Sequence, residues 1–255
     1  MTSSRGLGDV YKRQIFLVGA CSQSEQNSEP ASQTMVEYVW MTAGPDFNAE
    51  NLAFAINTWN QMIDDMGCSL NANILTPEVE NEGYDFIWAH IWESEEARDN
   101  CWSDWEDNHK TDWDNAIAGI MNYDLDNVYM FKPTVEKSPK MENTSGTFVN
   151  SFYFCTVNEG YSMADLDAYK ESLNQMDVFS DYWWYLTLEP MFEADPKPDF
   201  VWLDIWGSAE DRDSDRETWS KTSLPADVEA KFSCLPNSNG AGFVGTVIRL
   251  SLIHI

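Results

Sequence analysis

The sequence predicts an α+β protein built from two copies of one β-α-β-β-α-β unit, and three observations support this prediction. Residues 85–99 return 114 positions later as residues 199–213, with nine of the fifteen positions identical. The same offset pairs the Asn-Gln-Met of residues 60–62 with that of residues 174–176 without a gap. Each copy also shows the same order of strand and helix patterns. A repeat at a fixed period of this kind indicates a tandem duplication.

Both ends of the chain resemble translated sequencing adaptor. Residues 4–14, SRGLGDVYKRQ, and residues 250–255, LSLIHI, resemble the two strands of one library adaptor. We therefore expect residues 1–14 and 250–255 to be artefact, with a real basic N-terminus as the alternative. On this interpretation His254 has no function, and the histidines that remain are His90 and His109.

The chain is strongly acidic, with a formal net charge of −28. Leaving out the adaptor-like ends gives 12 basic and 42 acidic residues, so the remainder is more acidic still. Such a charge repels phosphate backbones and excludes nucleic acid as a partner. The acidic residues are expected to form a solvated surface, with cation binding as the alternative. An aromatic content of 14%, with 12 Trp, is ample for a packed core and excludes a disordered chain.

Residues 15–21 form a short apolar run that ends in small residues and a cysteine. The run is too short to span a bilayer. It resembles the end of a bacterial lipoprotein signal, with Val18-Gly19-Ala20-Cys21 as the lipobox. This resemblance implies lipidation of Cys21, a membrane anchor in the cell envelope and, from Ser22, the outer membrane facing the periplasm. A buried strand is the alternative, but polar residues 22–35 have the composition of a tether.

The first strand and first helix of each copy are marked by local signals. Residues 36–42 alternate between two faces and are rich in β-formers, so they predict a strand. Asn48 has the position of a helix N-cap, with Phe47 and Leu52 placed as a hydrophobic staple. The second copy repeats this device at Ser162, with an acidic residue three positions later. We expect a helix after each first strand.

Three further strands and a second helix complete each copy. Ser94 and Ser208 are expected to cap the second helix, whose first turn is acidic, as the helix dipole prefers. The strands are expected at residues 69–76, 86–92 and 128–131, and again at residues 182–188, 200–206 and 243–248. The stretch between the copies has no periodicity and predicts a linker. The first repeat is thus placed at residues 36–132, the linker at 133–148 and the second repeat at 149–249.

A β-α-β-β-α-β unit with a four-stranded antiparallel sheet is ferredoxin-like. Two such units in tandem resemble the dimeric α/β-barrel superfamily, in which two sheets face each other and helices cover the outside. The resemblance covers residues 36–249, rests on topology and duplication, and implies an intrachain pseudo-dimer. Its members include antibiotic-biosynthesis-type and haem-degrading monooxygenases. The resemblance implies that the protein binds a small apolar or aromatic molecule and carries out a cofactor-independent, monooxygenase-like reaction on it.

The third strand of each copy has one aliphatic and one aromatic face. The aliphatic face, Ile87, Ala89 and Ile91, is expected to pack beneath the helices. The aromatic face is expected to point into the barrel, where a cavity would suit a polar residue among large rings. The residues expected to line this pocket are Tyr38, Trp40, Thr42, Trp88, Trp92, Phe154, Thr156, Trp202, Asp204 and Trp206.

His90 is the candidate catalytic residue, as a general base on an acidic phenol or enol. The alternative is a core histidine that is hydrogen-bonded to a neighbour, because the second copy has Asp204 at the matching position. A non-catalytic structural or interaction domain with a filled barrel is the corresponding alternative for the whole protein.

No cofactor is expected. Haem is disfavoured because His109 lies in a polar setting, Asp-Asn-His-Lys, and no sequence motif for a metal site appears. An exported protein with an even number of cysteines beyond Cys21 permits disulfides. The four cysteines beyond Cys21 are Cys68, Cys101, Cys155 and Cys234. Cys68 with Cys101 is the first pairing to test, and Cys155 is expected to be a buried free thiol.

Overall fold

The computed structural model describes residues 34–80, 82–236 and 240–250. The lipobox at Cys21, the tether up to residue 33, residues 1–14 and residues 251–255 of the adaptor-like ends lie outside the described residues. Among the helices of the described part, none is long and apolar enough to cross a membrane.

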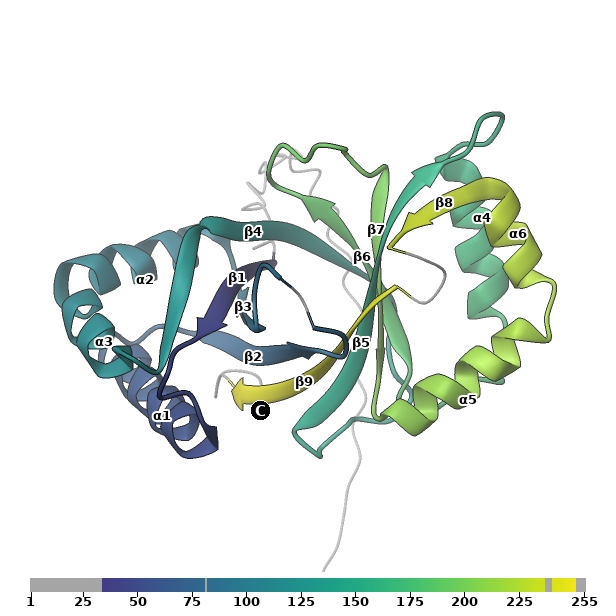
Figure 1. Ribbon diagram of the computed structural model, residues 1–255. Helices are drawn as coiled ribbons and strands as arrows, with labels where there is room; N and C mark the ends of the chain where they lie inside the picture. The colour runs from purple at the N-terminus through teal and green to yellow at the C-terminus, as the bar shows by residue number, and fades with distance from the viewer. Residues whose placement is uncertain (1–33, 81, 237–239, 251–255) are drawn as a thin grey trace, which may run out of the picture. The chain divides into compact units, whose positions relative to one another are not determined.

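The described chain is an α+β structure with an antiparallel β-barrel and six helices (Figure 1). Eight strands follow one another in the order β7-β6-β4-β1-β3-β2-β9-β5, and a pairing of β5 with β7 closes the ring. The ninth strand, β8, pairs with the end of β5. The elements are β1 (Met35–Ala43), α1 (Ala49–Asp65), β2 (Leu70–Pro77), β3 (Phe86–Trp92), α2 (Glu95–Asn108), α3 (Lys110–Ile117), β4 (Met121–Lys137), β5 (Thr147–Val157), α4 (Met163–Asn174), β6 (Trp184–Pro190), β7 (Phe200–Trp206), α5 (Ala209–Ser220), α6 (Leu224–Lys231), β8 (Phe232–Leu235) and β9 (Ala241–Arg249).

The two halves of the barrel have the same internal strand order. Strands β4-β1-β3-β2 form one half, and β9-β5-β7-β6 form the other in the corresponding order. Two antiparallel pairings join the halves, β4 with β6 and β2 with β9. Backbone hydrogen bonds therefore run continuously around the barrel.

The helices begin where local capping chemistry places them. The Asn48 side chain accepts a hydrogen bond from the backbone N–H of Asn51 at 3.0 Å, which starts α1 as predicted. Ser94 and Ser208 accept in the same way at the start of α2 and α5. The sequence did not predict α3, α6 or β8.

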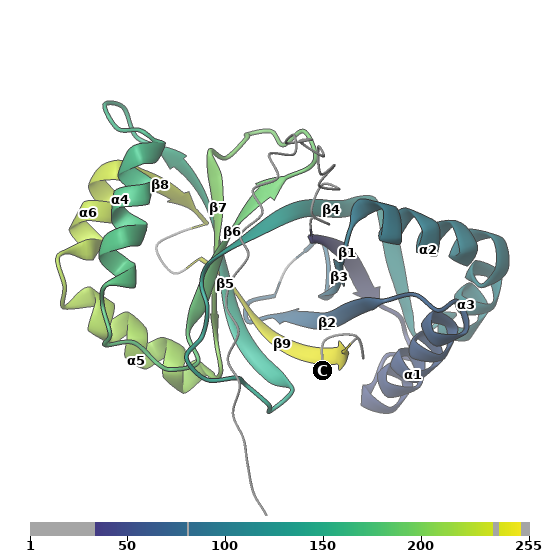
Figure 2. The same cartoon turned by 180° about the vertical axis from the view of Figure 1, so that it is seen from behind.

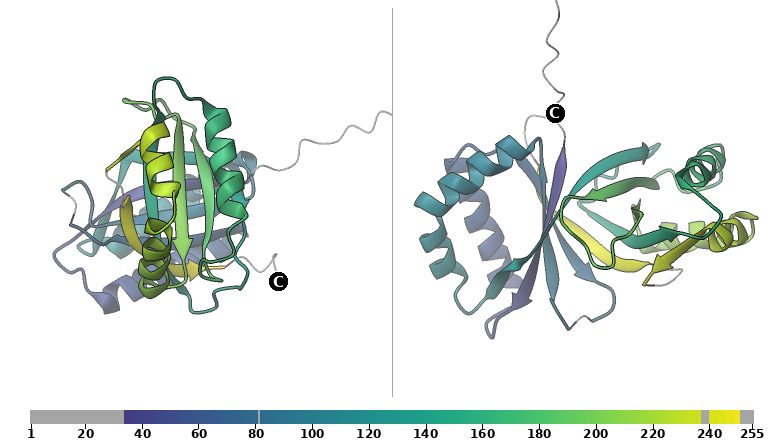
Figure 3. Two further views of the ribbon diagram at one scale, coloured as in Figure 1. Left: turned by 90° about the vertical axis from the view of Figure 1, so that its right-hand side faces the viewer. Right: turned by 90° about the horizontal axis from the view of Figure 1, so that it is seen from above.

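Three clusters of buried side chains fill the structure. One lies between the first half of the barrel and α1, α2 and α3, and a second lies between the other half and α4, α5 and α6. Figure 2 shows these two groups of helices on opposite sides of the strands. The third fills the barrel interior with side chains from both halves, including Val36, Ile87, Ala89, Leu186, Val201 and Leu203. Viewed from above, the helices lie on the outer sides of the strands (Figure 3).

The expected orientation of the third strand is wrong in both halves. Trp88 and Trp202 lie in the clusters beneath the helices, whereas Ile87 and Ala89 point into the barrel. The interior of an eight-stranded barrel is filled by side chains that meet at its centre. Here the aliphatic side chains of β3 and β7 pack in it with rings from other strands, such as Tyr38 and Phe152, while the indoles of β3 and β7 pack against the helices. Alternation identifies two faces, but it does not say which one points inward when both are buried.

The expected linker also begins with a strand. β4 continues to Lys137, and residues 131–137 pair with β6. The reason is that β4 forms one of the two joins between the halves, a long-range pairing that local periodicity cannot reveal. Within β4, Leu125, Asp126 and Asn127 form a bulge opposite the step from Val39 to Trp40.

All four cysteines of the described chain form disulfides. Cys68 pairs with Cys101, which is the pairing named above as the first to test. The prediction that Cys155 is a free thiol is wrong, because Cys155 pairs with Cys234. The register of β5 and β8 sets these two residues directly opposite each other.

We expect the Cys155–Cys234 disulfide to stabilise the fold, because it closes a loop with a sequence separation of 79. Replacing both residues by Ser should lower the free energy of unfolding by about 2 to 5 kcal/mol. Urea unfolding of the paired variant against the native chain, with Cys21→Ser in both, measures this loss. Thiol titration of the denatured, unreduced Cys21→Ser protein should find no reactive thiol. One or two reactive thiols per chain would contradict the pairing.

Candidate functional site

A cavity of about 350 Å³ lies between the first half of the barrel and its helices. We call it cavity one. Its walls come from β1, β3 and β4 on one side and from α1, α2 and α3 on the other. The aromatic part of the lining consists of Trp59, Trp88, Trp102, Trp105, Trp113 and Tyr123, and the polar part is dominated by Glu37, His90 and Arg98.

Glu37 is the centre of the polar wall. It lies on β1, is 2% exposed and accepts hydrogen bonds at both carboxylate oxygens. Arg98 of α2 donates from Nε to Oε1 at 2.7 Å, and its Nη2 donates to the same oxygen. Trp102 Nε1 donates to Oε2 at 2.9 Å, and His90 Nδ1 lies 3.2 Å from that oxygen. The charged donors compensate the burial of the carboxylate.

The ionisation of Glu37 fixes the tautomer of His90. Burial alone would raise the pKa of Glu37, but the hydrogen bond from His90 and the charges of His90 and Arg98 outweigh it and lower the pKa to about 2. An ionised carboxylate can only accept hydrogen bonds, so His90 Nδ1 must carry the proton. In the neutral imidazole, Nε2 is then the atom that can accept a proton or bind a metal.

Aromatic rings hold the imidazole of His90 in place. Trp59 is stacked on it with ring centroids 5.5 Å apart, and Trp102 meets it edge-on at 5.2 Å. Trp92 lies 6.0 Å away on the same face of β3. His90 is therefore buried and oriented, and its ring lines cavity one.

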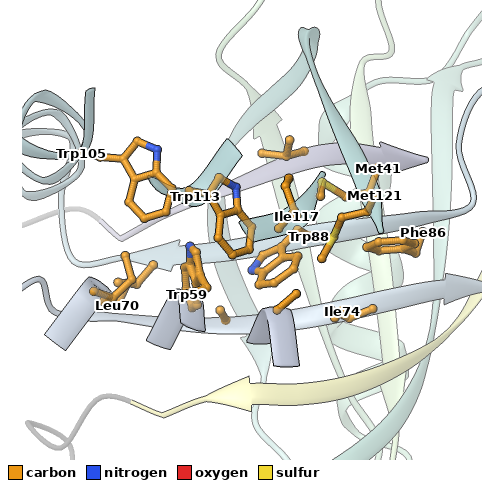
Figure 4. Close-up of a cluster of buried hydrophobic side chains, with 14 of the residues drawn as sticks. Met41, Trp59, Leu70, Ile74, Phe86, Trp88, Trp105, Trp113, Ile117 and Met121 are labelled. Carbon is orange, nitrogen blue, oxygen red and sulfur yellow. The ribbon is translucent and has the colours of Figure 1, made fainter. Parts of the chain in front are cut away.

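Trp88 presents an indole N–H beside this cavity that has no partner. The side chain is 2% exposed, and Nε1 is one of the buried polar atoms of the described residues that lack a hydrogen bond. Figure 4 shows the indole nitrogen on the side of the ring toward Trp59 and Trp113, whose ring centroids lie 5.3 and 6.0 Å from that of Trp88. A buried donor without an acceptor costs free energy. A ligand with an acceptor atom would remove that cost.

The other half of the barrel has an equivalent cavity of about 340 Å³, which we call cavity two. It lies between β5, β7 and β8 and the helices α4, α5 and α6, with Phe179 and Trp183 from the segment before β6 (Trp184–Pro190). Its lining is more apolar and includes Tyr153, Tyr169, Trp183, Trp202, Trp206 and Trp219. Asp204, Asp215, Arg216 and Glu229 supply its charged groups.

The 114-residue offset shows how the charges differ between the cavities. Glu37 corresponds to Ser151, His90 to Asp204, and Trp102 to Arg216. Arg216 Nη2 donates to Ser151 Oγ at 3.0 Å, in place of the Arg98 to Glu37 pair. The carboxylate has moved from the first strand of the half to its third strand.

Asp204 is a carboxylate in apolar surroundings. Trp183 Nε1 donates to Oδ1 at 3.0 Å, and the indole of Trp202 is also a donor. Burial raises the pKa of Asp204 to about 6, against the smaller opposing effects of these donors and of the charge of Arg216. The side chain is half-buried and lines cavity two.

The structure brings together only some of the residues expected from the sequence. Trp88 and His90 line cavity one, with Trp92 packed against His90, and Trp202, Asp204 and Trp206 line cavity two. Tyr38 and Trp40 lie on the opposite, interior face of β1, and Thr42, Phe154 and Thr156 are exposed. These last five contribute to neither cavity.

Three residues of the polar wall, Glu37, Arg98 and Trp102, were not predicted from the sequence. The available signal was an acidic residue in β1 on the same face as Met35 and Val39, where a charge needs a partner. Arg98, conserved in the second copy as Arg212, was a second signal. Within the described residues there is no group of three His, Cys, Asp or Glu placed to hold a metal ion.

Comparison with protein-family models and with curated protein sequences found no match. Comparison with solved structures found the same barrel architecture. A proposed monooxygenase from Lactobacillus acidophilus matches with a TM-score of 0.50 and 11% identity, over 86% of this chain and 96% of that one. Chlorite dismutase from Candidatus Nitrospira defluvii, in complex with imidazole, matches with a TM-score of 0.51 and 8% identity, over 86% and 93% of the two chains. At these identities the likeness shows the dimeric α/β-barrel fold alone.

The expectation of a protein without a cofactor, with haem disfavoured, is wrong for this architecture, because the chlorite dismutases are haem proteins. Haem iron takes an axial ligand from His, Cys thiolate, Met or Tyr. The donors of this kind in the lining of cavity two are not in a suitable state, because Cys155 and Cys234 are bonded to each other and burial raises the pKa of both Tyr153 and Tyr169. In cavity one, Nε2 of His90 is an atom that could ligate haem iron. Nδ1 of the same ring faces the Glu37 carboxylate, and a carboxylate in this position orients a ligating histidine.

Acidification should remove the stabilisation that Glu37 provides. Its pKa in the folded protein, about 2, lies below the ordinary 4.5, so the contribution is complete above pH 4.5 and is lost as the pH falls toward 2. The difference corresponds to about 3 kcal/mol at 1.36 kcal/mol per pKa unit. Urea unfolding at pH 5 and pH 2.5 should show a smaller acid-induced loss for Glu37→Gln than for the native chain. Exposed Glu142→Gln is the control and should match the native loss; a native-like loss in Glu37→Gln would contradict the ion-pair assignment.

Proposed function

We propose that cavity one binds a small planar aromatic molecule bearing a phenol or enol, and that His90 accepts its proton. One observation carries the proposal: Glu37 fixes the His90 tautomer so that Nε2 is the proton-accepting atom, in a ring that lines an aromatic cavity. The unpartnered Trp88 Nε1 lies two residues away on the same face of β3. The pair matches a ligand with one hydroxyl and one acceptor, such as a carbonyl oxygen.

Each group has a distinct part in this proposal. Glu37 holds the imidazole and would stabilise the imidazolium that forms when Nε2 takes a proton. Arg98 and Trp102 hold Glu37, so they act through it. The indole rings of the lining supply apolar area and exclude water, which strengthens the electrostatic interactions inside. The activity we propose is a monooxygenase-like reaction in which dioxygen oxidises the ionised ligand: the ligand supplies the electrons, one oxygen atom enters it as a carbonyl, and the other leaves as water. The likeness to the Lactobacillus protein supports this activity through the fold alone.

Haem binding in cavity one is the second candidate. Nε2 of His90, with its carboxylate partner, is the observation that favours it. Haem would supply the redox chemistry of its iron there, while Glu37 would orient the ligating imidazole. Both candidates use Nε2, so a phenol and haem would compete for the site.

A structural or interaction domain is the alternative to any ligand-binding function. The barrel interior is filled, as that alternative expects. The two cavities, however, lie outside the barrel beneath the helices, and cavity one contains an indole N–H without a partner. An apolar filling of these positions would be more stable, and the retained polar groups favour a ligand.

We also propose that the halves are duplicated ferredoxin-like units and that the chain is a lipoprotein of the outer membrane. The equivalent strand orders support the duplication. The two disulfides support an oxidising compartment such as the periplasm. The lipobox supports the anchor at Cys21.

The ligand proposal is tested with 4-hydroxy-1-naphthaldehyde, whose naphtholate absorbs at longer wavelength than the naphthol. Binding to the native chain at a pH below the probe's own pKa should shift its absorption toward that of the naphtholate, because His90 Nε2 accepts the proton. His90→Gln should abolish the shift, and Trp88→Phe should weaken binding roughly 2- to 12-fold through one lost hydrogen bond. His109→Gln is the matched control, because His109 does not line the cavity.

The outcomes separate the possibilities. An unchanged spectral shift in His90→Gln, with a folded protein, would rule out His90 as the base. Displacement of the probe by haem, together with a haem spectrum that His90→Gln alters, would favour the second candidate. A large stability loss in His90→Gln with unaltered affinity would make His90 a satisfied core residue.

The lipoprotein proposal predicts membrane partitioning. Expressed behind a complete signal sequence, the protein should sediment with membranes, because an acyl chain on the N-terminal cysteine anchors it. Cys21→Ser should move it to the soluble fraction. Equal partitioning of the two proteins would contradict lipidation at Cys21.

A further inference from the structure

We propose that cavity two is a second ligand site, which binds a small aromatic ammonium ion with its charge on Asp204 and its ring among the indoles. This inference does not depend on the proposed function of cavity one. It rests on the partners of Asp204, on the composition of the cavity walls, and on the contrast between Asp204 and Glu37.

The carboxylate of Asp204 has neutral donors where Glu37 has charged ones. Glu37 is engaged by a guanidinium, an imidazole and an indole. Among the described residues, the donors to Asp204 are the indoles of Trp183, with Nε1 at 3.0 Å, and of Trp202, and none of the ion pairs there includes Asp204. A half-buried carboxylate in apolar surroundings gains more from a cation than one that is already paired.

The positive group that influences Asp204, Arg216, has other contacts. Arg216 donates to Ser151 Oγ at 3.0 Å, and its guanidinium lies 5.7 Å from the centroid of the Trp206 ring. The cavity lining contains three carboxylates, Asp204, Asp215 and Glu229, against this one guanidinium. The net charge of the chain, −28, adds to the field that attracts a cation to the mouth of the cavity.

The walls suit an organic cation better than a hydrated metal ion. Four indoles line the cavity, from Trp183, Trp202, Trp206 and Trp219, and the faces of indole rings attract ammonium groups. Phe179, Phe200 and Leu173 supply apolar area for a ring on the same ligand. The volume, about 340 Å³, lies at the lower end of the range for small-molecule sites.

The ionisation of Asp204 makes binding depend on pH. The titratable groups that face it are Tyr153 of β5, Tyr169 of α4, Tyr185 of β6, and Asp215 and Arg216 of α5. Burial raises the pKa of each of these tyrosines, so they stay neutral near pH 7. The pKa of Asp204, about 6, means that the cation must displace a proton below that pH.

The probe is benzyltrimethylammonium, whose charge does not titrate, measured by tryptophan fluorescence and calorimetry on the full chain at physiological ionic strength. We expect saturable binding to the native protein, weaker binding of the neutral benzyl tert-butyl ether, and about a tenfold loss of affinity between pH 7.5 and pH 5. Asp204→Asn should lose tenfold or more at pH 7.5 and should lose the pH dependence. It should fold at least as well as the native chain, because it removes a carboxylate that burial disfavours.

Glu210→Gln is the matched control, since it removes the same charge from α5 at an exposed position outside the cavity. Its affinity should stay within twofold of the native value. Equal losses in Asp204→Asn and Glu210→Gln would assign binding to the surface field and overturn the proposal. Native affinity that does not change between pH 7.5 and pH 5, or a tighter fit of the neutral ether, would also overturn it.

Discussion

Closure of the barrel is the constraint on which the rest of this structure depends. Once β5 pairs with β7, every strand of the ring has one face turned toward a narrow interior and the other toward helices or solvent. The interior is filled by residues such as Val36, Ile87 and Val201 from both halves. The interior also holds rings such as Tyr38, Phe152 and Phe243. The buried tryptophans and the charged groups Glu37, His90 and Asp204 lie on the other face, beneath α1 to α3 or α4 to α6. Both cavities are consequences of this division.

The two halves use one backbone plan with different charge arrangements. In the first half, a carboxylate on β1 is saturated by donors and orients an imidazole on β3. In the second half, the strand position of that carboxylate carries Ser151, and the position of the imidazole carries Asp204. A carboxylate whose oxygens are fully engaged by charged donors orients the neighbouring imidazole, whereas one without a charged partner is available to a cationic ligand. The chemical difference between the cavities follows from these two exchanges.

Sequence patterns predicted what depends on neighbours in the chain. The caps at Asn48, Ser94 and Ser208 and the strand at residues 86–92 require only local hydrogen bonds and alternation. The placement of Trp88 failed because alternation distinguishes two buried faces without ranking them. The pairing of Cys155 with Cys234 was missed because it depends on β8, a four-residue strand with no periodic signal of its own. Glu37 was missed because its partners lie more than fifty residues away.

The joins of β4 with β6 and of β2 with β9 affect how the molecule reports on its ligands. Because the ladder of backbone hydrogen bonds is continuous, neither half can lose its strands without breaking those of the other. Global unfolding is then one cooperative event, and a molecule bound in either cavity opposes all of it. A rise in melting temperature would register occupancy without revealing which cavity is filled. Local hydrogen exchange in α2 or α5, which opens below the global limit, is the observable that assigns the ligand to one side.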